Sequence, residues 1–280
     1  MKYGSVCSGI EAATVAWHPF GWKAAWYSEI EPFPCAALKH HYPAVPNYGD
    51  MTKYEEWPDE PINLFVGGTP CQSFSVAGLR KGLADPRGNL MLTYGAIARR
   101  YRPEWLLWEN VPGVLSSNRG QDFGTFLGML AELGYGFAYR VLDAQYFGVA
   151  QRRRRVFVVA NARSWQRAAA VLFESHSLQG HPAPSREEGA GVGWVFPCLT
   201  RNGPGCLREE EALVIEQSGI RRLTPTECER LQGFPDNYTN IPWRKKPESP
   251  DGPRYKALGN SMAVPVMAWI GNRIKQVSEL

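Results

Sequence analysis

The first 160 residues alternate short apolar runs with amphipathic stretches. Six apolar runs are predicted to be strands: Tyr3–Cys7, Lys23–Ser28, Leu64–Gly67, Trp105–Glu109, Gly136–Asp143 and Arg155–Ala160. The stretches between them carry helical periodicity at Ile10–Trp17, Phe33–His40, Asn89–Tyr101 and Thr125–Leu133. Strands that alternate with helices predict an α/β fold, with a mostly parallel sheet covered by helices on both faces.

The pattern changes after about residue 160. His176–Gly193 is rich in Ser, Gly, Pro and Glu and has no sustained periodicity, which favours loop. Helical signals return at Thr224–Gln232, where Thr and Glu are spaced as in a capping box, and at Ala263–Gln276 after a turn predicted at Leu258–Ser261. The sequence therefore predicts one domain from residues 1–160 plus 221–280, and a small loop-rich module at residues 161–220.

Composition places the chain among ordinary globular proteins. It has 280 residues, of which 44% are hydrophobic and 21% charged. No run approaches the roughly 18 apolar residues that a membrane span needs, and the N-terminal segment lacks the apolar core of a secretory signal. We therefore expect a cytoplasmic protein. Its six cysteines form no Cys-x-x-Cys pair and are expected to be free thiols, and no zinc site or other metal site is predicted.

Charge is distributed unevenly along the chain. Residues 1–150 carry a net charge of −2 and residues 151–280 a net charge of +6, within a total of +4. The second half also holds four consecutive arginines, Arg152 to Arg155. A polyanion partner such as nucleic acid explains this asymmetry, although solvated surface charge explains it equally well.

Reactive side chains follow several predicted strands, at the sheet edge where ligands bind in parallel α/β folds. Gly67-Gly68-Thr69-Pro70-Cys71-Gln72 ends a strand in a constrained turn and offers Cys71 as a nucleophile, with a cysteine packed in a turn as the alternative. Glu109 ends another strand before Pro112, and is interpreted as a carboxyl in the same cleft or as half of an ion pair.

The arginine run enters the apolar strand that begins at Arg155. Period-two alternation places Gln151, Arg153 and Arg155 on one face, with Arg152 and Arg154 on the other. Arginines at the mouth of a buried strand require an anionic or carbonyl-rich environment, unless the strand edge is solvated.

Together these segments resemble the DNA cytosine-5 methyltransferases of bacterial and phage type. Pro70-Cys71-Gln72 resembles their nucleophile loop, Glu109-Asn110-Val111 their Glu-Asn-Val motif, and Gln151, Arg153 and Arg155 their Gln-x-Arg-x-Arg motif. Arg222–Pro235 is similar to the segment after their target-recognition region, and Gly259-Asn260-Ser261 to their final motif. Five motifs in the family's order make the resemblance specific.

The resemblance implies a Rossmann-like methyltransferase fold that uses S-adenosylmethionine and leaves S-adenosylhomocysteine. The implied catalytic residues are Cys71, Glu109, Arg153 and Arg155. The implied cofactor-binding residues are Cys7, Gly9, Ile10, Glu29, Ile30, Asp50, Met51, Pro70, Leu90, Asn260 and Met262. The implied DNA-binding residues are Gln72, Ser73, Arg87, Thr200, Arg201 and Asn202. Where the family commonly has a second glycine in its first motif, this chain has Glu11, and we expect this change to bear on cofactor affinity rather than identity.

The implied reaction begins with attack of the Cys71 thiolate on C6 of a cytosine flipped out of double-stranded DNA. Glu109 would hold N3 and the exocyclic amine, and the two arginines O2 and the adjacent backbone. Two alternatives remain: an RNA cytosine-5 methyltransferase acting on transfer RNA, and a catalytically inactive DNA-binding protein on the same scaffold. We expect a nucleoid-associated monomer, in the setting of restriction–modification.

The expected recognition module is short. Its best candidate for reading bases is Leu199-Thr200-Arg201-Asn202-Gly203, where Arg201 could pair with guanine and Asn202 with adenine. Because such a module positions few side chains, we expect a site of about two to four base pairs.

Overall fold

The computed structural model describes residues 1–70, 90–173, 199, 213–216 and 219–280. The strands are β1 (Lys2–Val6), β2 (Lys23–Ser28), β3 (Leu64–Gly67), β4 (Trp105–Asn110), β5 (Gly136–Asp143), β6 (Arg154–Asn161), β7 (Leu213–Glu216) and β8 (Gly219–Arg222). The α-helices are α1 (Ala12–Trp17), α2 (Pro32–His41), α4 (Leu90–Tyr101), α5 (Gln121–Glu132), α6 (Trp165–Leu172), α7 (Pro225–Gln232), α8 (Asp251–Asn260) and α9 (Val264–Ser278). Short 3-10 turns, including η2 (Met51–Glu56), connect them.

Six strands form one sheet in the order β2-β1-β3-β4-β6-β5. The pairs among β2, β1, β3 and β4 are parallel, whereas β6 runs antiparallel to both of its neighbours. The expectation of a mostly parallel α/β sheet is confirmed, with β6 as the one reversed strand among those six. Its reversal brings the beginning of β6 to the sheet edge where the parallel strands end.

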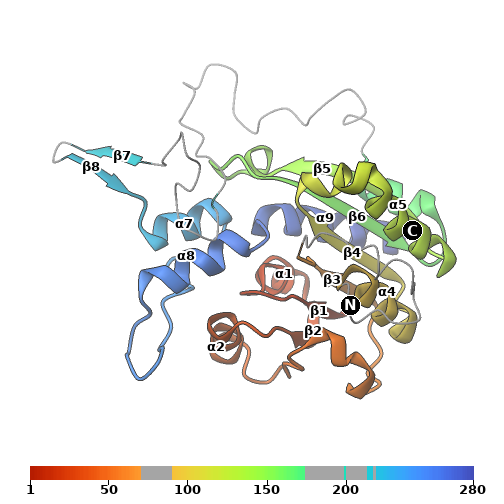
Figure 1. The fold of residues 1–280 in the computed structure, drawn as a ribbon, viewed down its shortest axis with the longest axis horizontal. Helices are drawn as coiled ribbons and strands as arrows, with labels where there is room; N and C mark the ends of the chain where they lie inside the picture. The colour runs from red at the N-terminus through yellow and green to blue at the C-terminus, as the bar shows by residue number, and fades with distance from the viewer. Residues whose placement is uncertain (71–89, 174–198, 200–212, 217–218) are drawn as a thin grey trace.

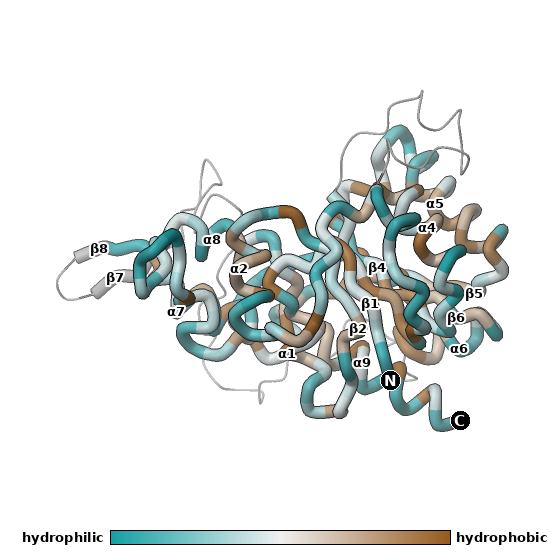
Figure 2. The backbone as a smooth tube through the Cα atoms, turned by 90° about the horizontal axis from the view of Figure 1, so that it is seen from below, coloured by the Kyte–Doolittle hydropathy of each residue, from teal (hydrophilic) through white to brown (hydrophobic). Residues whose placement is uncertain are grey.

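The central strands bury both faces, as period-two alternation requires. In β4, Trp105 and Leu107 join one hydrophobic cluster and Leu106 and Trp108 the other. The first cluster also takes in α1, α6 and α9, and the second α4 and α5, so helices cover both faces of the sheet (Figure 1). Figure 2 shows hydrophobic segments at α4 and α5 and hydrophilic ones around β8.

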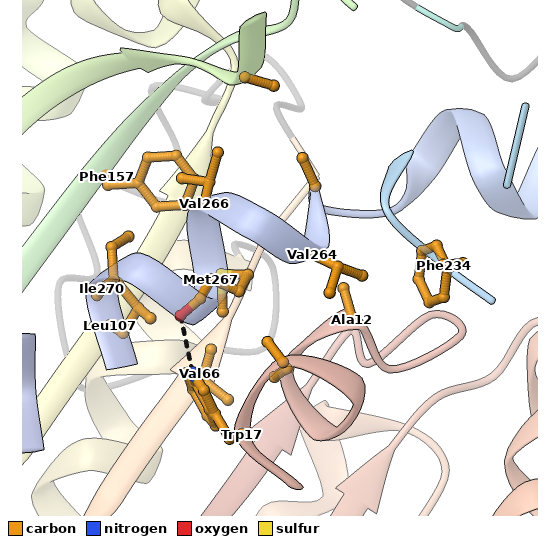
Figure 3. Close-up of a cluster of buried hydrophobic side chains, with 14 of the residues drawn as sticks. Ala12, Trp17, Val66, Leu107, Phe157, Phe234, Val264, Val266, Met267 and Ile270 are labelled. Carbon is orange, nitrogen blue, oxygen red and sulfur yellow. Dashed lines mark hydrogen bonds between the residues drawn. The ribbon is translucent and has the colours of Figure 1, made fainter. Parts of the chain in front are cut away.

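The C-terminal helix α9 returns to the N-terminal half of the chain. Its residues pack between Trp17 of α1 and Phe157 of β6, and the Trp17 indole N–H donates to the Met267 carbonyl at 2.8 Å (Figure 3). Burial of these apolar side chains, rather than local propensity, holds a helix 250 residues away in sequence against α1.

Two expectations about organisation differ from the structure. Residues 165–172 were assigned to the loop-rich module and no helix was predicted there, but they form α6, which packs on β5, β6 and α9 because Ala168, Val171 and Leu172 are fully buried. The predicted turn at Leu258–Ser261 is instead the end of α8, a helix whose Gly and Pro content conceals it in sequence. After residue 173, the described residues of the expected module are Leu199, β7 and the start of β8; the β7–β8 pair lies beside α7 on the left of Figure 1.

Candidate active site

A cavity opens at the sheet edge where β1, β3 and β4 end. Its wall is formed by the loop after β1, by Gly68 after β3, by Glu109 of β4 and by the segment Asn260–Met262. Four of the predicted cofactor residues, Cys7, Gly9, Asn260 and Met262, therefore meet around one cavity, together with the predicted catalytic Glu109. The parallel topology accounts for this grouping, because it places the loops after β1, β3 and β4 side by side.

The loop after β1 has an unusual backbone. Cys7, Gly9 and Glu11 all have positive φ, at 48°, 57° and 60°. The Gly9 N–H donates to the carboxylate of Glu29 at 2.8 Å, and the same carboxylate accepts the N–H groups of Ile30 and Glu31, each at 2.8 Å. Glu29 thus fixes the loop after β1 to the end of β2.

The other predicted cofactor residues are distributed around this loop. Ile30 has an exposed fraction of 68%, which leaves an apolar surface for a ligand. Asp50 caps η2 by accepting the Thr52 N–H at 2.9 Å, and Met51 places its sulfur 3.6 Å from that of Cys7. Ile10 is only 1% exposed and packs in the core, so its side chain does not line the cavity.

Two predicted cofactor residues lie at the boundaries of the described ranges. Pro70 is exposed and Leu90 is half-buried at the start of α4. Neither lines the cavity.

Glu109 and Arg155 form an ion pair at the cavity edge. The Arg155 Nε lies 3.1 Å from Glu109 Oε1, and both side chains are largely buried. Burial raises the pKa of Glu109, while the positive charges of Arg155 and Arg153 lower it in part. A Cβ at Gly68 would lie 2.9 Å from Glu109 Oε2, so glycine here leaves the room that this carboxylate occupies. The Gly67-Gly68 pair predicted a constrained turn here, but not this close approach of the Glu109 carboxylate.

Arg153 has a different role from Arg155. It is buried, and its guanidinium donates to the carbonyls of Leu199 at 3.1 Å, Gly259 at 3.1 Å and Ser261 at 2.6 Å. The carbonyl-rich environment expected for the arginine run is therefore present. These bonds join the residue that precedes β6 to Leu199 and to the segment that carries Asn260.

The expected alternation along this run is confirmed. Gln151 and Arg153 are buried and Arg155 is half-buried, whereas Arg152 and Arg154 are exposed. The Gln151 amide bridges the Leu199 N–H and the Leu231 carbonyl, at 3.1 Å and 2.9 Å. The side chains of Gln151 and Arg153 thus make hydrogen bonds within the protein, and Arg155 pairs with Glu109, which lines the cavity.

The described cysteines are poor nucleophiles. Burial raises the pKa of Cys7 to about 12, with a contribution from the charge of Glu29, and burial raises the pKa of Cys228 to about 12. Burial also raises the pKa of Cys35. A thiol with such a pKa is almost wholly protonated at neutral pH, so none of these three is a ready thiolate.

Several predicted residues lie outside the described residues: Cys71, Gln72, Ser73, Arg87, Thr200, Arg201 and Asn202. Tyr238, by contrast, was missed by sequence reasoning, although its hydroxyl donates to the Ile10 carbonyl of the loop at 2.8 Å. No sequence signal marks this contact, because 228 residues separate the two.

Two kinds of feature are absent from the described residues. No group of three or more His, Cys, Asp or Glu side chains there is arranged to hold a metal ion. None of the helices described is both long and apolar enough to cross a membrane.

Comparison with known proteins gives consistent matches. The family model for C-5 cytosine-specific DNA methylase matches residues 1–188 and 186–276. The type II methyltransferase M2.BsuMI of Bacillus subtilis (strain 168) is 32% identical over 298 residues, covering 99% of this chain and 76% of that protein. The structure of Schizosaccharomyces pombe Dnmt2 methyltransferase superposes with a TM-score of 0.77 at 16% identity, with full coverage of both chains, which shows a shared fold.

A relative from Escherichia phage P1 is named a DNA N-6-adenine-methyltransferase. It is 34% identical over 458 aligned residues, covering 97% of this chain. This chain spans only 61% of the length of that protein.

Proposed function

This chain belongs to the C-5 cytosine-specific DNA methylase family, and on that premise we propose that it methylates C5 of cytosine in double-stranded DNA. The proposal includes S-adenosylmethionine as the methyl donor, a flipped-out target base and a transient bond between Cys71 and C6. It also places the protein, as a monomer, in the cytoplasm at the nucleoid. The observation that carries it is the Glu109–Arg155 pair at the rim of a cavity walled by the loop after β1.

The residues around the cavity fit the proposed cofactor. The exposed Ile30 offers an apolar surface for the adenine ring. The preceding residue, the acidic Glu29, is the one expected to bind the ribose hydroxyls. The loop at Cys7 and Gly9, together with Asn260 and Met262, forms the cavity wall that would hold the rest of the molecule. When bound, S-adenosylmethionine supplies an electrophilic methyl group.

The proposed reaction follows from what the protein's own side chains can do. Attack by the Cys71 thiolate forms a bond between its sulfur and C6, which breaks the aromaticity of the ring and makes C5 nucleophilic. Burial, which raises the pKa of Glu109, favours the protonated form that can donate to N3, whereas the ion pair with Arg155 favours the ionised form. Arg155 holds the Glu109 side chain and offers its charge to O2. Once C5 has taken the methyl group, with S-adenosylhomocysteine as the leaving group, loss of the C5 proton to solvent and cleavage of the carbon–sulfur bond restore the aromatic ring and free Cys71.

Arg153 has a supporting role in this site. Because its guanidinium is already bonded to three carbonyls, we assign it to holding the Asn260 segment rather than to contacting the base. The proposal therefore gives Arg153 a positioning role in place of the catalytic role expected from the sequence.

Adenine N6 is a second candidate, favoured only by the name of the phage P1 relative. A single experiment separates the candidates. The protein is incubated with tritiated S-adenosylmethionine and either unmethylated duplex DNA or transfer RNA, and the labelled nucleosides are separated. The proposal expects label in 5-methylcytosine from DNA. Label in N6-methyladenine, or label only in transfer RNA, overturns it.

The nucleophile has a matched control. Cys71→Ser should lose methyl transfer by at least about 100-fold, because a hydroxyl is a far weaker nucleophile at neutral pH. Cys35→Ser keeps the contact with the Glu29 carbonyl and should retain activity. DNA containing 5-fluorocytosine should trap a covalent adduct on the wild-type protein at Cys71. An active Cys71→Ser protein, or an adduct on another cysteine, contradicts the assignment.

A further inference from the structure

Glu11 is a buried carboxyl at the end of the loop after β1. Its exposed fraction is 1%, and its backbone is left-handed, with φ of 60°. Its carboxylate accepts the Ser5 hydroxyl at 2.5 Å, and the N–H and hydroxyl of Thr14 at 3.1 Å and 2.6 Å. The side chain therefore faces β1 and α1, and it does not add charge to the protein surface.

The Thr14 hydroxyl extends this contact to two tyrosines. Because it donates to Glu11, it accepts from Tyr3 at 2.6 Å and from Tyr27 at 2.9 Å. Tyr3 belongs to β1 and Tyr27 to β2. One buried carboxyl thus connects the first helix to two strands of the sheet.

The loop is also held from its other side. The Tyr238 hydroxyl donates to the Ile10 carbonyl at 2.8 Å and accepts from the Tyr42 hydroxyl at 3.0 Å. Glu29 accepts the Gly9 N–H, as described above. Each end of the segment from Gly9 to Glu11 is therefore fixed by a buried or half-buried polar side chain.

Left-handed backbone is costly for a residue with a Cβ, and glycine avoids this cost. Three hydrogen bonds to the buried carboxyl offset the backbone cost at Glu11. Glycine at this position would adopt the same φ but would supply none of the three bonds. Glu11 accordingly gives the loop an attachment to the sheet that glycine lacks.

We propose that Glu11 is a positioning residue that fixes the loop Cys7–Ile10 in its binding conformation by attaching it to Ser5 and Thr14. The inference rests on the proposed function, because it assigns this loop to the cofactor. Glu11 has no role in the chemical step. It acts by holding the loop in one conformation before the cofactor binds, so that less conformational entropy is lost on binding.

The first test measures the binding of S-adenosylhomocysteine by calorimetry. Glu11→Ala should weaken binding at least tenfold, because it keeps the backbone strain and loses all three bonds. Glu11→Gln can still accept from Thr14 and donate to Ser5, so it should bind within threefold of wild type. Glu11→Gly should bind S-adenosylhomocysteine with an affinity between those of Glu11→Ala and Glu11→Gln. Thr14→Val, which keeps the side-chain shape, should weaken binding threefold to tenfold and serves if Glu11→Ala does not fold.

A matched control separates positioning from general destabilisation. Asp122 of α5 is also a buried carboxyl, 1% exposed, and accepts the Ser117 hydroxyl at 2.5 Å on the opposite face of the sheet. Asp122→Ala should lower the melting temperature and leave S-adenosylhomocysteine binding within twofold. The inference is overturned if Glu11→Ala binds S-adenosylhomocysteine as tightly as wild type, or if Glu11→Gln loses as much affinity as Glu11→Ala. It is also overturned if Asp122→Ala loses as much affinity as Glu11→Ala.

Hydrogen exchange gives a readout that needs no cofactor. In the free protein, Glu11→Ala should speed exchange of the Gly9 and Glu11-position amides, whereas Asp122→Ala should leave them unchanged. If the wild-type protein binds no S-adenosylhomocysteine, the proposed cofactor is wrong, and the exchange comparison still decides whether Glu11 holds the loop. Unchanged exchange in Glu11→Ala overturns the inference by itself.

Discussion

Glu109 and Arg155 lie 3.1 Å apart although they come from strands that run in opposite directions. Glu109 is near the carboxyl end of β4, and Arg155 is near the beginning of β6. They meet because β6 is antiparallel to β4, so the start of one strand lies beside the end of the other. In a wholly parallel sheet the arginine would lie at the opposite edge. The reversed strand is thus what gives the proposed site its positive charge.

Glu109→Gln should slow methyl transfer by about 100-fold or more, because it removes the ionisable group proposed to contact the base. Cofactor affinity should change little, since Glu109 accepts from Arg155 and fixes no part of the loop after β1. Single-turnover rates with labelled S-adenosylmethionine give the first quantity and calorimetry the second.

Glu29→Ala should have the reverse effects of Glu109→Gln on cofactor affinity and on the chemical step. It removes the acceptor for three backbone N–H groups, so it should weaken cofactor binding by about tenfold, at roughly 1.4 kcal/mol, before it affects the chemical step. If Glu109→Gln loses the cofactor and Glu29→Ala keeps it, the two carboxylates have been assigned to the wrong roles.

Gly68→Ala should reduce methyl transfer without unfolding the protein. The added Cβ would lie 2.9 Å from Glu109 Oε2 and 3.1 Å from Met262 Cε, so the carboxylate must move. Gly124→Ala on the exposed face of α5 is the control, since a Cβ there meets no atom within 4 Å. That variant should retain activity and gain about 0.5–1 kcal/mol of stability. Equal activity of both variants would show that the position of Glu109 is not critical.

Much of the fold could be predicted from the alternation of apolar residues. The ranges Lys23–Ser28, Leu64–Gly67 and Gly136–Asp143 were predicted at their observed boundaries, because each is a short apolar run bounded by turn or charged residues. Helix α8 was not predicted, since its Gly and Pro residues are typical of a turn and its stability comes from burial of Ala257 and Leu258. Local patterns do not record such tertiary contacts.

The site could be predicted only in part. The strand-end motifs indicated Glu109 and Arg155. The different environment of Arg153 depends on hydrogen bonds to the carbonyls of Leu199, Gly259 and Ser261, which are far away in sequence. The sequence shows Glu11 at a position where the family commonly has glycine. It does not show the hydrogen-bond partners of Glu11, because these depend on how β1 and α1 pack together.

The stability of the protein should depend on pH through Glu11. Burial raises the pKa of Glu11 from 4.5 to about 7, partly opposed by its bonds to Ser5 and Thr14. Between about pH 4.5 and pH 7 the unfolded chain releases this proton before the folded chain does, so the free energy of unfolding falls as pH rises. A shift of this size corresponds to roughly 3 kcal/mol.

Glu11→Gln removes this titration. The difference in unfolding free energy between Glu11→Gln and wild type should therefore grow in favour of the variant from pH 4.5 to pH 7 and level off above it. The other groups that face Glu11 are Glu29 and the phenols of Tyr3, Tyr27, Tyr42 and Tyr238, and both proteins contain them. Urea titrations at four pH values measure the difference. A constant difference across this range would contradict the buried, proton-binding state of Glu11.

Arg153 and Arg152 are adjacent arginines with opposite environments, and replacing each by methionine tests the role assigned to the first. Arg153→Met leaves three buried carbonyls without this donor, and an unsatisfied buried polar group costs about 1–3 kcal/mol. We expect a loss of roughly 3 kcal/mol in the free energy of unfolding, because some carbonyls will recruit water. Cofactor affinity should also fall, since two of these carbonyls flank Asn260 on the cavity wall.

Arg152→Met changes the same charge on an exposed side chain, so its stability should stay within about 0.5 kcal/mol of wild type. Any effect of Arg152→Met should be on DNA affinity, and it should shrink as salt is raised, because a phosphate contact is screened. Urea unfolding, calorimetry with S-adenosylhomocysteine and DNA binding at two salt concentrations separate these effects. If Arg153→Met folds and binds cofactor normally but loses only methyl transfer, the guanidinium acts on the base after all, and the segment at Asn260 is held by other contacts.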